Sequence, residues 1–577
     1  MPILGMHGFF PAAAASAPWL NMPCMPPLNA EPTGRMPLPP TMLHDLPARA
    51  AGCWPGAVAL VSDGRRCSYA DLQSQIEAFT VALLRLAVSP GDRVGVYLDK
   101  RVETVVASFG ATRAGGVLVP VNPVLKPAQV AHVLQDSGAR VLVTSAARLR
   151  ALASVLPLCT ELAHVVLVDA ALDGDHVGVE AVRGHWTTHG WPCTITEAVP
   201  VRELPLRLET DPAAIFYTSG STGRPKGVVL SHRNLVAGAA SVVTYLGNHG
   251  GDVLLAALPL SFDAGFSQLT TAFLVGARVV LLNYLLPRDV LLAMACEGVT
   301  GLTAVPPMYM QLVGLEWPAE ATAQLRYWAN TGGRMPRATL DALRAKAPQA
   351  QPFLMYGLTE AFRSTYLPPE QVDRRPDSIG RAIPNVQVLV LREDGTECAV
   401  DEPGELVHRG PLVAQGYWRR PEESAQRFKP LPVHFQAGGH ERPAPEVAVY
   451  SGDTVRRDAD GFLYFVGRRD EMIKTSGYRV SPTEVEEAVF ASGLVQESLA
   501  VGMEHEALGQ AIHVAAVASA TVSGDIARDT AALLAFCRMQ LPAYMVPAVV
   551  HWVTQPLPRN PNGKLDRQRW KAEHAGL

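Results

Sequence analysis

The feature that most constrains the fold of this chain is an alternation of short apolar runs with longer amphipathic stretches, which begins near residue 42. DRVGVYL (92–98) and GVLVPV (116–121) have the composition of strands, whereas ADLQSQIEAFTVALLRLA (70–87) has the apolar spacing of a helix. Strands that alternate with helices usually pair in parallel, because each helix carries the chain back across the sheet. The pattern therefore predicts an α/β fold with mostly parallel sheets.

Chain length and changes of pattern predict more than one structural unit. A chain of 577 residues is longer than one hydrophobic core usually holds. Residues 383–467 contain short strand-like runs broken by Gly and Asp turns, which indicates a β-rich subdomain, and a compact α+β pattern follows Gly467. We therefore expect a large N-terminal body at 42–468 and a small C-terminal domain at 469–577.

Residues 1–41 precede these elements and carry no charge before Glu31. Their scattered prolines are incompatible with a membrane-spanning helix, and no basic residues precede an apolar stretch as they do in a signal peptide. We expect a disordered extension or sequence ahead of the true start, with Met36 and Met42 as candidate initiators. Charges interrupt every other apolar stretch before it reaches the ~20 residues that span a bilayer, so a soluble protein is predicted.

The charge balance and the cysteines narrow the classes of partner and compartment. Lys and Arg number 50 against 54 Asp and Glu, and no long basic run occurs, which argues against a nucleic-acid partner. The eight cysteines are scattered without a C-x-x-C pair. Such cysteines are typical of buried free thiols in a reducing compartment, so a cytoplasmic protein is expected.

The segment YTSGSTGRPKG (217–227) concentrates hydroxyls and glycines around Lys226. A strand (213–218) precedes this loop and a helix (231–246) follows it with Ser231 as N-cap, so we expect the loop to connect strand and helix. Glycines let the backbone approach a ligand, hydroxyls and N–H groups donate to phosphate oxygens, and the lysine adds positive charge. The loop predicts a polyphosphate cradle, although its spacing is not that of a P-loop. A flexible surface loop of small residues is the alternative.

At this loop the chain resembles the acyl-adenylate-forming superfamily, which includes acyl-CoA synthetases, firefly-type luciferases and the adenylation domains of peptide synthetases. Other segments that resemble family motifs are CSYADL (67–72), TRAGGVLVPVNP (112–123), YGLTE (356–360), GELVHRG (404–410), YSGD (450–453), GRRDEMIKTSGYRVSPTEVEE (467–487) and NPNGKLDR (560–567). Together they cover nearly all of the chain after residue 42. The run 356–385 looks most like the AMP-forming acyl-CoA ligases associated with exosortase A systems.

The resemblance implies an acyl-CoA synthetase-like fold, in which a small mobile α+β domain closes on a large body with parallel sheets and a β-rich subdomain. It also implies a two-step reaction. A carboxylate attacks the α-phosphorus of ATP to give an acyl-adenylate and pyrophosphate, and a thiol then displaces AMP. The implied cofactors are ATP, Mg²⁺ and either CoA or a phosphopantetheine acceptor, so the partners are a small carboxylic acid and, if the acceptor is protein-bound, an acyl or peptidyl carrier protein.

The resemblance also assigns catalytic roles to four residues. Lys564 would bridge the acyl carboxylate and the α-phosphate, and Lys226 would contact the β- and γ-phosphates. Thr359 would contact the α-phosphate, and Glu360 would be the magnesium ligand. These roles suit the chemistry, because a weak nucleophile and an anionic triphosphate need positioning and charge neutralisation.

Further residues are expected at the nucleotide, the hinge and the thiol. Tyr356 would stack on adenine and Asp453 would accept both ribose hydroxyls. The expected ATP-binding residues are Thr218, Ser219, Gly220, Ser221, Thr222, Gly223, Gly332, Gly333, Tyr356, Asp453, Arg468 and Arg479. Asp470 matches the family's hinge, and Gly477 lies in the segment that would face the pantetheine thiol.

The acid itself is left open by the sequence. Asp263 aligns by resemblance with an aspartate that holds the α-ammonium group in members that activate amino acids. A buried carboxylate is costly without a partner, so either the substrate carries a donor or Asp263 is satisfied within the protein. The alternatives to an acid-thiol ligase are therefore an amino-acid adenylation enzyme that loads a carrier protein, or an inactive homologue that acts as a binding protein.

Overall fold

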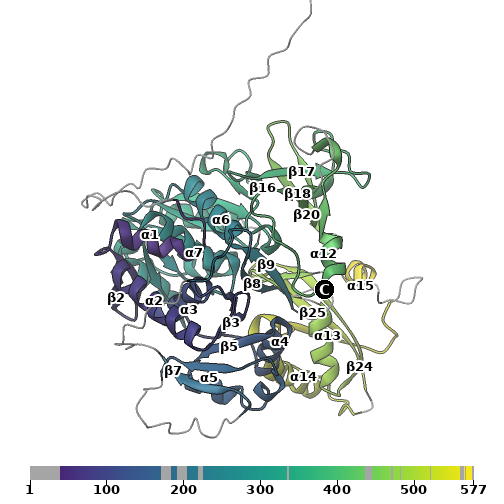
Figure 1. The fold of residues 1–577 in the computed structure, drawn as a ribbon. Helices are drawn as coiled ribbons and strands as arrows, with labels where there is room; N and C mark the ends of the chain where they lie inside the picture. The colour runs from purple at the N-terminus through teal and green to yellow at the C-terminus, as the bar shows by residue number, and fades with distance from the viewer. Residues whose placement is uncertain are drawn as a thin grey trace, which may run out of the picture.

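The structure is a computed structural model that describes most of the chain after residue 38. The described ranges are 39–169, 184–191, 204–218, 225–333, 335, 337–435, 445–468, 472–480, 482–519, 521–558, 565 and 567–574. The prediction of an α/β protein with a large body and a small C-terminal α+β unit is confirmed (Figure 1). The extension 1–41 lies almost wholly outside the described residues.

One sheet of the body carries the glycine-rich loop at its edge. Its strand order is β7-β6-β5-β3-β4-β8-β9, and every pair is parallel except β8 with β9. The strands are β3 (Arg93–Val96), β4 (Val117–Pro120), β5 (Ala139–Thr144), β6 (His164–Leu167), β7 (Thr187–Gly190), β8 (Pro212–Thr218) and β9 (Lys226–Ser231).

A longer sheet forms the rest of the body, with the order β17-β18-β20-β21-β16-β15-β14-β13-β12-β10-β11-β1-β2 and β19 beside β20. Its central strands are parallel, and pairing becomes antiparallel from β14 to β15 onward. The strands are β1 (Val58–Ser62), β2 (Arg65–Ser68), β10 (Val253–Ala256), β11 (Arg278–Leu281), β12 (Gly301–Ala304), β13 (Tyr327–Asn330), β14 (Gln351–Tyr356), β15 (Thr365–Leu367), β16 (Ser378–Ala382), β17 (Gln387–Leu391), β18 (Gly404–Arg409), β19 (Phe428–Pro430), β20 (Val447–Arg457) and β21 (Leu463–Arg468). The β-rich region expected at 383–467 thus continues the same sheet.

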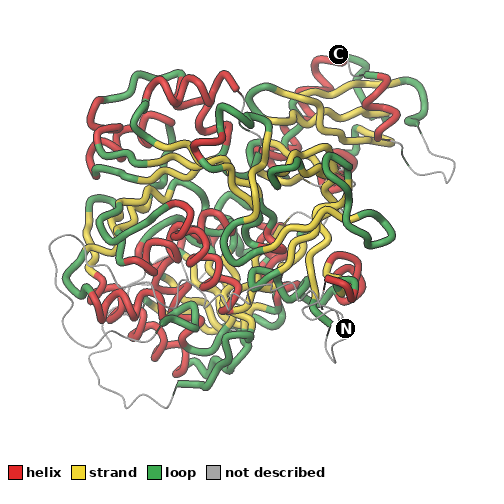
Figure 2. The backbone as a smooth tube through the Cα atoms, turned by 90° about the horizontal axis from the view of Figure 1, so that it is seen from above, coloured by secondary structure: helices red, strands yellow, loops and turns green. Residues whose placement is uncertain are grey.

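Helices cover both sides of the strands of the body (Figure 2). They are α1 (Asp45–Cys53), α2 (Tyr69–Arg85), α3 (Val102–Arg113), α4 (Pro127–Ser137), α5 (Ala146–Ala151), α6 (His232–Leu246), α7 (Asp263–Val275), α8 (Pro287–Glu297), α9 (Pro306–Val313), α10 (Ala319–Ala323), α11 (Arg337–Lys346) and α12 (Pro421–Arg427). The main core lies where α7 packs between the sheets. Phe266 of α7 contacts Phe109 of α3 and Phe216 of β8, with ring centroids 5.8 and 5.7 Å apart.

The C-terminal unit has its own sheet, with the order β23-β22-β25-β24 and β26 beside β25. Its elements are β22 (Ile473–Thr475), β23 (Tyr478–Val480), α13 (Pro482–Ala491), β24 (Val495–His505), β25 (Gly509–Ala518), α14 (Ile526–Gln540), β26 (Val549–Val553) and α15 (Arg567–Glu573). A separate core of buried side chains, such as Val485, Val514 and Leu533, holds it together. In Figure 1 this unit lies beside the body, with α13 next to α4.

Two expectations from the sequence are corrected. The glycine-rich loop does not lead straight into a helix, because β9 lies between them and pairs antiparallel with β8. Cys296 is exposed, whereas the other described cysteines are buried free thiols. Across the described residues, no helix is both long and apolar enough to cross a membrane.

Candidate active site

The glycine-rich loop joins two antiparallel strands at the edge of the smaller sheet. Thr218, the last residue of β8, is paired with Lys226, the first residue of β9. The loop residues Ser219, Gly220, Ser221, Thr222 and Gly223 lie outside the described residues. Helix α6 begins directly after β9, where Ser231 accepts the N–H of Asn234 and the Asn234 side chain accepts the Ser231 N–H, which is the N-cap that the sequence predicts.

Lys226 is held by groups that the sequence did not single out. Its ammonium forms an ion pair with Glu423 of α12, and it lies 5.6 Å from the centre of the Tyr417 ring. Its side chain is only 12% exposed. A lysine fixed between a carboxylate and an aromatic face presents its charge in a defined place, as phosphate binding requires.

Tyr417 connects Lys226 to Glu360. The segment around Tyr417 runs along β9, with the Val229 N–H donating to the Gly416 carbonyl over 2.9 Å and the Trp418 N–H to the Gly227 carbonyl over 2.7 Å. The Tyr417 hydroxyl then donates to Glu360 Oε1 over 2.7 Å. Burial, and next the charge of Glu360, raise the pKa of Tyr417, so this hydroxyl stays a donor to the carboxylate.

Glu360 lies in the short 3-10 turn Thr359–Ala361, which directly follows β14 and Gly357-Leu358. The carboxylate is buried, with 4% of the residue exposed. The Glu360 carbonyl also accepts the Ala414 N–H over 2.9 Å, which fixes the turn against the segment that carries Tyr417. The YGLTE motif thus places Thr359 and Glu360 at the carboxyl end of a strand, where α/β proteins usually bind ligands.

Tyr356 and Asp453 meet across the sheet. Tyr356 ends β14, Asp453 lies in β20, and the Tyr356 hydroxyl donates to the Asp453 carboxylate. Asp453 is fully buried, and its N–H donates to the Ser451 hydroxyl over 3.1 Å. Ser451 therefore supports the backbone that carries Asp453, and the structure brings the two residues expected at the nucleoside into one place.

The C-terminal unit contacts the body at two glycines. Gly332 and Gly477 both have positive φ, 76° and 82°. A Cβ on Gly332 would lie 3.2 Å from the Gly477 carbonyl, and a Cβ on Gly477 would lie 2.6 Å from Val305 Cγ1. The turn between β22 and β23 thus rests on Gly332, and only glycine fits at Gly477 in this arrangement.

Several expected residues of the C-terminal segment are not described. Lys564 and Asp470 lie outside the described residues, and only the backbone is described for Arg468 and Arg479. The neighbours of Lys564 are described in part. Leu565 packs against the core of the C-terminal unit, and Arg567 donates to both carboxylate oxygens of Glu486 over 2.8 and 2.7 Å.

Asp263 is the first residue of α7 and is half-buried. Its Oδ1 accepts the N–H of Ala264 over 2.6 Å. Part of its hydrogen-bonding capacity is therefore met by its own helix, which is compatible with both possibilities that the sequence left open.

Three residues near the site were missed by sequence reasoning. Tyr417 and Glu423 lie in GYWRRPEES, where neither charge nor spacing distinguishes them. Arg363 lies three residues after Glu360 in the run YGLTEAFR. No local signal distinguishes Arg363, because an arginine between Phe362 and Ser364 has the pattern of an ordinary surface charge.

A comparison with protein-family models identifies the family of this chain. The model of the AMP-binding enzyme matches residues 47–418, and the model of the AMP-binding enzyme C-terminal domain matches residues 484–564. The chain belongs to the AMP-binding enzyme family. Its curated relatives include long-chain-fatty-acid–CoA ligases and linear gramicidin synthase subunits.

Both an acyl-CoA ligase and a gramicidin synthase protein match most of this chain. A long-chain-fatty-acid–CoA ligase of Escherichia coli O157:H7 is 30% identical over 90% of this chain and 92% of its own length. One of the linear gramicidin synthase proteins of Brevibacillus parabrevis is 30% identical over 91% of this chain, which spans only 9% of that much longer protein. Among solved structures, an o-succinylbenzoate CoA synthetase from Bacillus subtilis superposes with a TM-score of 0.74 at 26% identity, over 91% of this chain and 97% of the other.

Proposed function

We propose that this AMP-binding enzyme activates a carboxylic acid and passes it to a thiol, with the residue roles expected from its motifs. In the first step an oxygen of the acid forms a bond to the α-phosphorus of ATP, and the bond from that phosphorus to pyrophosphate breaks. In the second step the sulfur of CoA, or of a carrier-protein pantetheine, forms a bond to the acyl carbon and AMP leaves. The exosortase-associated ligases remain our proposal for the subtype.

The observation that carries this proposal is the contact chain from Lys226 through Tyr417 to Glu360. Through Tyr417, Lys226 and Glu360 lie near each other, and we assign Lys226 to the leaving phosphates and Glu360 to Mg²⁺. Magnesium takes one or two protein carboxylates and completes its shell with phosphates and water. Bound there, the ion would neutralise charge on the phosphates. Within this chain, Glu360 would hold the ion and Tyr417 would orient the Glu360 carboxylate.

The Gly332–Gly477 contact supports the thiol step. Here the turn of the C-terminal unit lies against Gly332, so the segment assigned to the thiol is next to a residue assigned to the nucleotide. Lys564 belongs to the same unit, and we propose that the unit rotates about Asp470 between the half-reactions.

The test is acid-dependent exchange of labelled pyrophosphate into ATP across a library of fatty acids, short acids and amino acids. For an active acid, Lys564→Ala should lower the exchange rate by about 100-fold or more, because a charge that stabilises the transition state is lost. ATP binding, measured by equilibrium dialysis, should persist.

The matched control for this variant is Lys571→Ala, which removes a lysine of α15 from the same unit. This control should exchange like wild type. Equal exchange rates for Lys564→Ala and wild type would refute the assigned mechanism. Activity with amino acids alone would favour the carrier-loading alternative.

A further inference from the structure

A small cavity lies beside the candidate active site, between α6, α7 and the strands β12 to β14. Its volume is about 20 Å³, enough for a group the size of a water molecule. Aliphatic side chains such as Leu246 and Met355 form part of its wall, and Gln268, Thr271 and Arg363 form another part. Apolar walls with a few polar groups at one place are typical of ligand sites, but a cavity of this size admits only the terminal atoms of a ligand.

Among these polar groups, Arg363 has the highest free-energy cost of burial, because it is charged. It is 4% exposed, and the hydrogen bond that it makes among the described residues is from Nη1 to Thr331 Oγ1, over 3.2 Å. Its Nε is buried with no acceptor, and no described carboxylate forms an ion pair with it. An arginine is rarely buried unless it is paired, because removing a charge from water costs several kcal/mol.

The two polar neighbours on α7 are also incompletely paired within the described part of the chain. Thr271 Oγ1 has no hydrogen-bond partner there. Gln268 donates from Nε2 to the Leu255 carbonyl over 3.2 Å, but its Oε1 has none. A cation, a hydroxyl and an amide thus share one cavity with unused hydrogen-bonding capacity, which a polar ligand group would use.

The backbone holds Arg363 in place at some cost. Phe362, just before it, has a φ of 56°, a value that bulky residues seldom adopt. The Phe362 ring is fully buried against Gly238, where a Cβ would lie 2.4 Å from the ring. Strain of this kind persists where surrounding structure enforces it, and it fixes the point from which the Arg363 side chain leaves the backbone.

The lining of the cavity is next in sequence to residues of the candidate site, since Ala264 follows Asp263 and Met355 precedes Tyr356. Arg363 lies three residues after Glu360, and its partner Thr331 directly precedes Gly332. Asp263, by contrast, is not among the residues that line the cavity. An acyl group that extends from the candidate site past Ala264 would bring its far end to the polar groups of the cavity.

From this geometry, and resting on the proposed function, we infer that the substrate is a short acid with a second, distal carboxylate. Arg363 would bind the distal carboxylate through its guanidinium, and Thr271 would donate its hydroxyl. The ion pair would supply the counter-charge that Arg363 lacks among the described residues. A plain alkyl end would leave the guanidinium buried without it.

The experiment compares matched acids in the pyrophosphate exchange assay. Malonate, succinate, glutarate and adipate are each measured against the monocarboxylate of equal chain length, propionate to hexanoate. The expected result is a preference of roughly 10- to 100-fold in kcat/KM for at least one dicarboxylate over its partner, the value of a hydrogen-bonded charge.

Variants then assign that preference to Arg363. Arg363→Gln should abolish it, chiefly through a higher KM for the dicarboxylate, while Arg363→Lys should retain part of it. The control Arg381→Gln, at an exposed position of β16, should behave like wild type. Thermal unfolding of each variant with AMP shows whether it is folded, and dicarboxylate should raise the melting temperature of wild type but not of Arg363→Gln.

The possible failures are distinguishable. Better exchange with every monocarboxylate, or an unchanged preference in Arg363→Gln, overturns this inference and leaves the proposed function intact. A preference for amino acids without a distal carboxylate overturns it in favour of a role for Asp263. Exchange with no acid at all overturns the proposed function and this inference together.

Discussion

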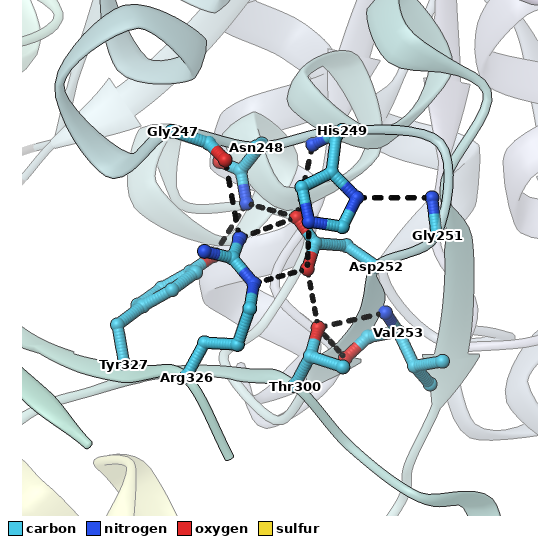
Figure 3. Close-up of polar contacts among 9 residues, drawn as sticks. All are labelled: Gly247, Asn248, His249, Gly251, Asp252, Val253, Thr300, Arg326 and Tyr327. Carbon is cyan, nitrogen blue, oxygen red and sulfur yellow. Dashed lines mark hydrogen bonds and ion pairs between the residues drawn. The ribbon is translucent and has the colours of Figure 1, made fainter. Parts of the chain in front are cut away.

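Two buried charged side chains in the large body differ in the number of hydrogen-bonding partners around them. Asp252 is 1% exposed and accepts hydrogen bonds from Arg326 Nε and Nη2 over 2.8 and 2.7 Å, from Thr300 over 2.7 Å and from Asn248 over 3.1 Å (Figure 3). Arg363 is similarly buried and has one hydroxyl partner among the described residues. The protein supplies the counter-charge of Asp252, whereas none of the described residues supplies one for Arg363.

The cluster around Asp252 lies close to the cavity that contains Arg363. Asn248 also contacts the Tyr327 hydroxyl over 3.0 Å, and Tyr327 lines the cavity that contains Arg363. The difference teaches that burial of a charge does not identify its role. The Asp252 cluster joins the end of α6 to β10 and β13 and stabilises the wall of the cavity, whereas Arg363 has the capacity to bind something else.

The largest effect is expected from Asp252→Ala. Removing the carboxylate leaves the groups around it without their acceptor, so the free energy of unfolding should fall by about 3 kcal/mol. The free energy of unfolding is measured from the first transition in a urea titration. Asp341→Ala, which breaks an exposed pair with Arg337 at 3.1 Å, is the control and should change it by less than about 0.5 kcal/mol. Similar losses in both variants would show that the cluster is not structural.

The same cluster predicts that the stability of the protein depends on pH. Burial alone would raise the pKa of Asp252, but hydrogen bonds from Arg326 and Thr300 hold it below the usual value of 3.8. Because the folded pKa is depressed, the stability contribution is present above pH 3.8 and is lost as the pH falls through the lower folded value. Wild type should therefore lose more stability on acidification than Asp252→Ala does.

A smaller effect of opposite sign is expected from Arg363→Met. Methionine fills a similar volume without a charge, so the unliganded protein should gain about 1 kcal/mol in the free energy of unfolding. The measurement is the same urea titration without substrate. A loss comparable to that of Asp252→Ala would mean that the guanidinium is structural, and the comparison between the two sites would fail.

The smallest effect concerns a third internal charge, Glu484 of α13, which accepts a hydrogen bond over 3.0 Å from Gln129 of α4. Burial raises the pKa of Glu484 to about 7. Because burial raises the folded pKa, the stability contribution of the neutral Glu484 is full below the unfolded value of 4.5 and is lost as the pH rises through about 7.

Hydrogen exchange in α4 and α13 measures that contact. The amides of both helices should exchange faster at pH 8 than at pH 6 in wild type, beyond the intrinsic change with pH. Glu484→Gln should remove the difference, because the amide stays neutral. Glu506→Gln, which changes an exposed residue, should keep it. A persistent difference in Glu484→Gln would assign the pH response to another group.

Local sequence patterns predicted a helix or strand well where residues within one short segment determine it. The N-cap Ser231 is set by side chains within one turn, and it lies where the sequence predicts. Strand β9 was missed because VVL between a glycine loop and a helix is too short to show a period. Its pairing with β8 and with the segment at Tyr417 is what makes it a strand.

The sequence by itself determined the α/β class, the AMP-binding family and the motif residues, because these depend on local periodicity and on short ordered segments. Tertiary structure alone decided which groups meet. Tyr417 lies 57 positions from Glu360, and Thr331 lies 32 from Arg363. Whether a buried charge finds a partner depends on such distant contacts, so no local pattern distinguishes Arg363 from Arg326.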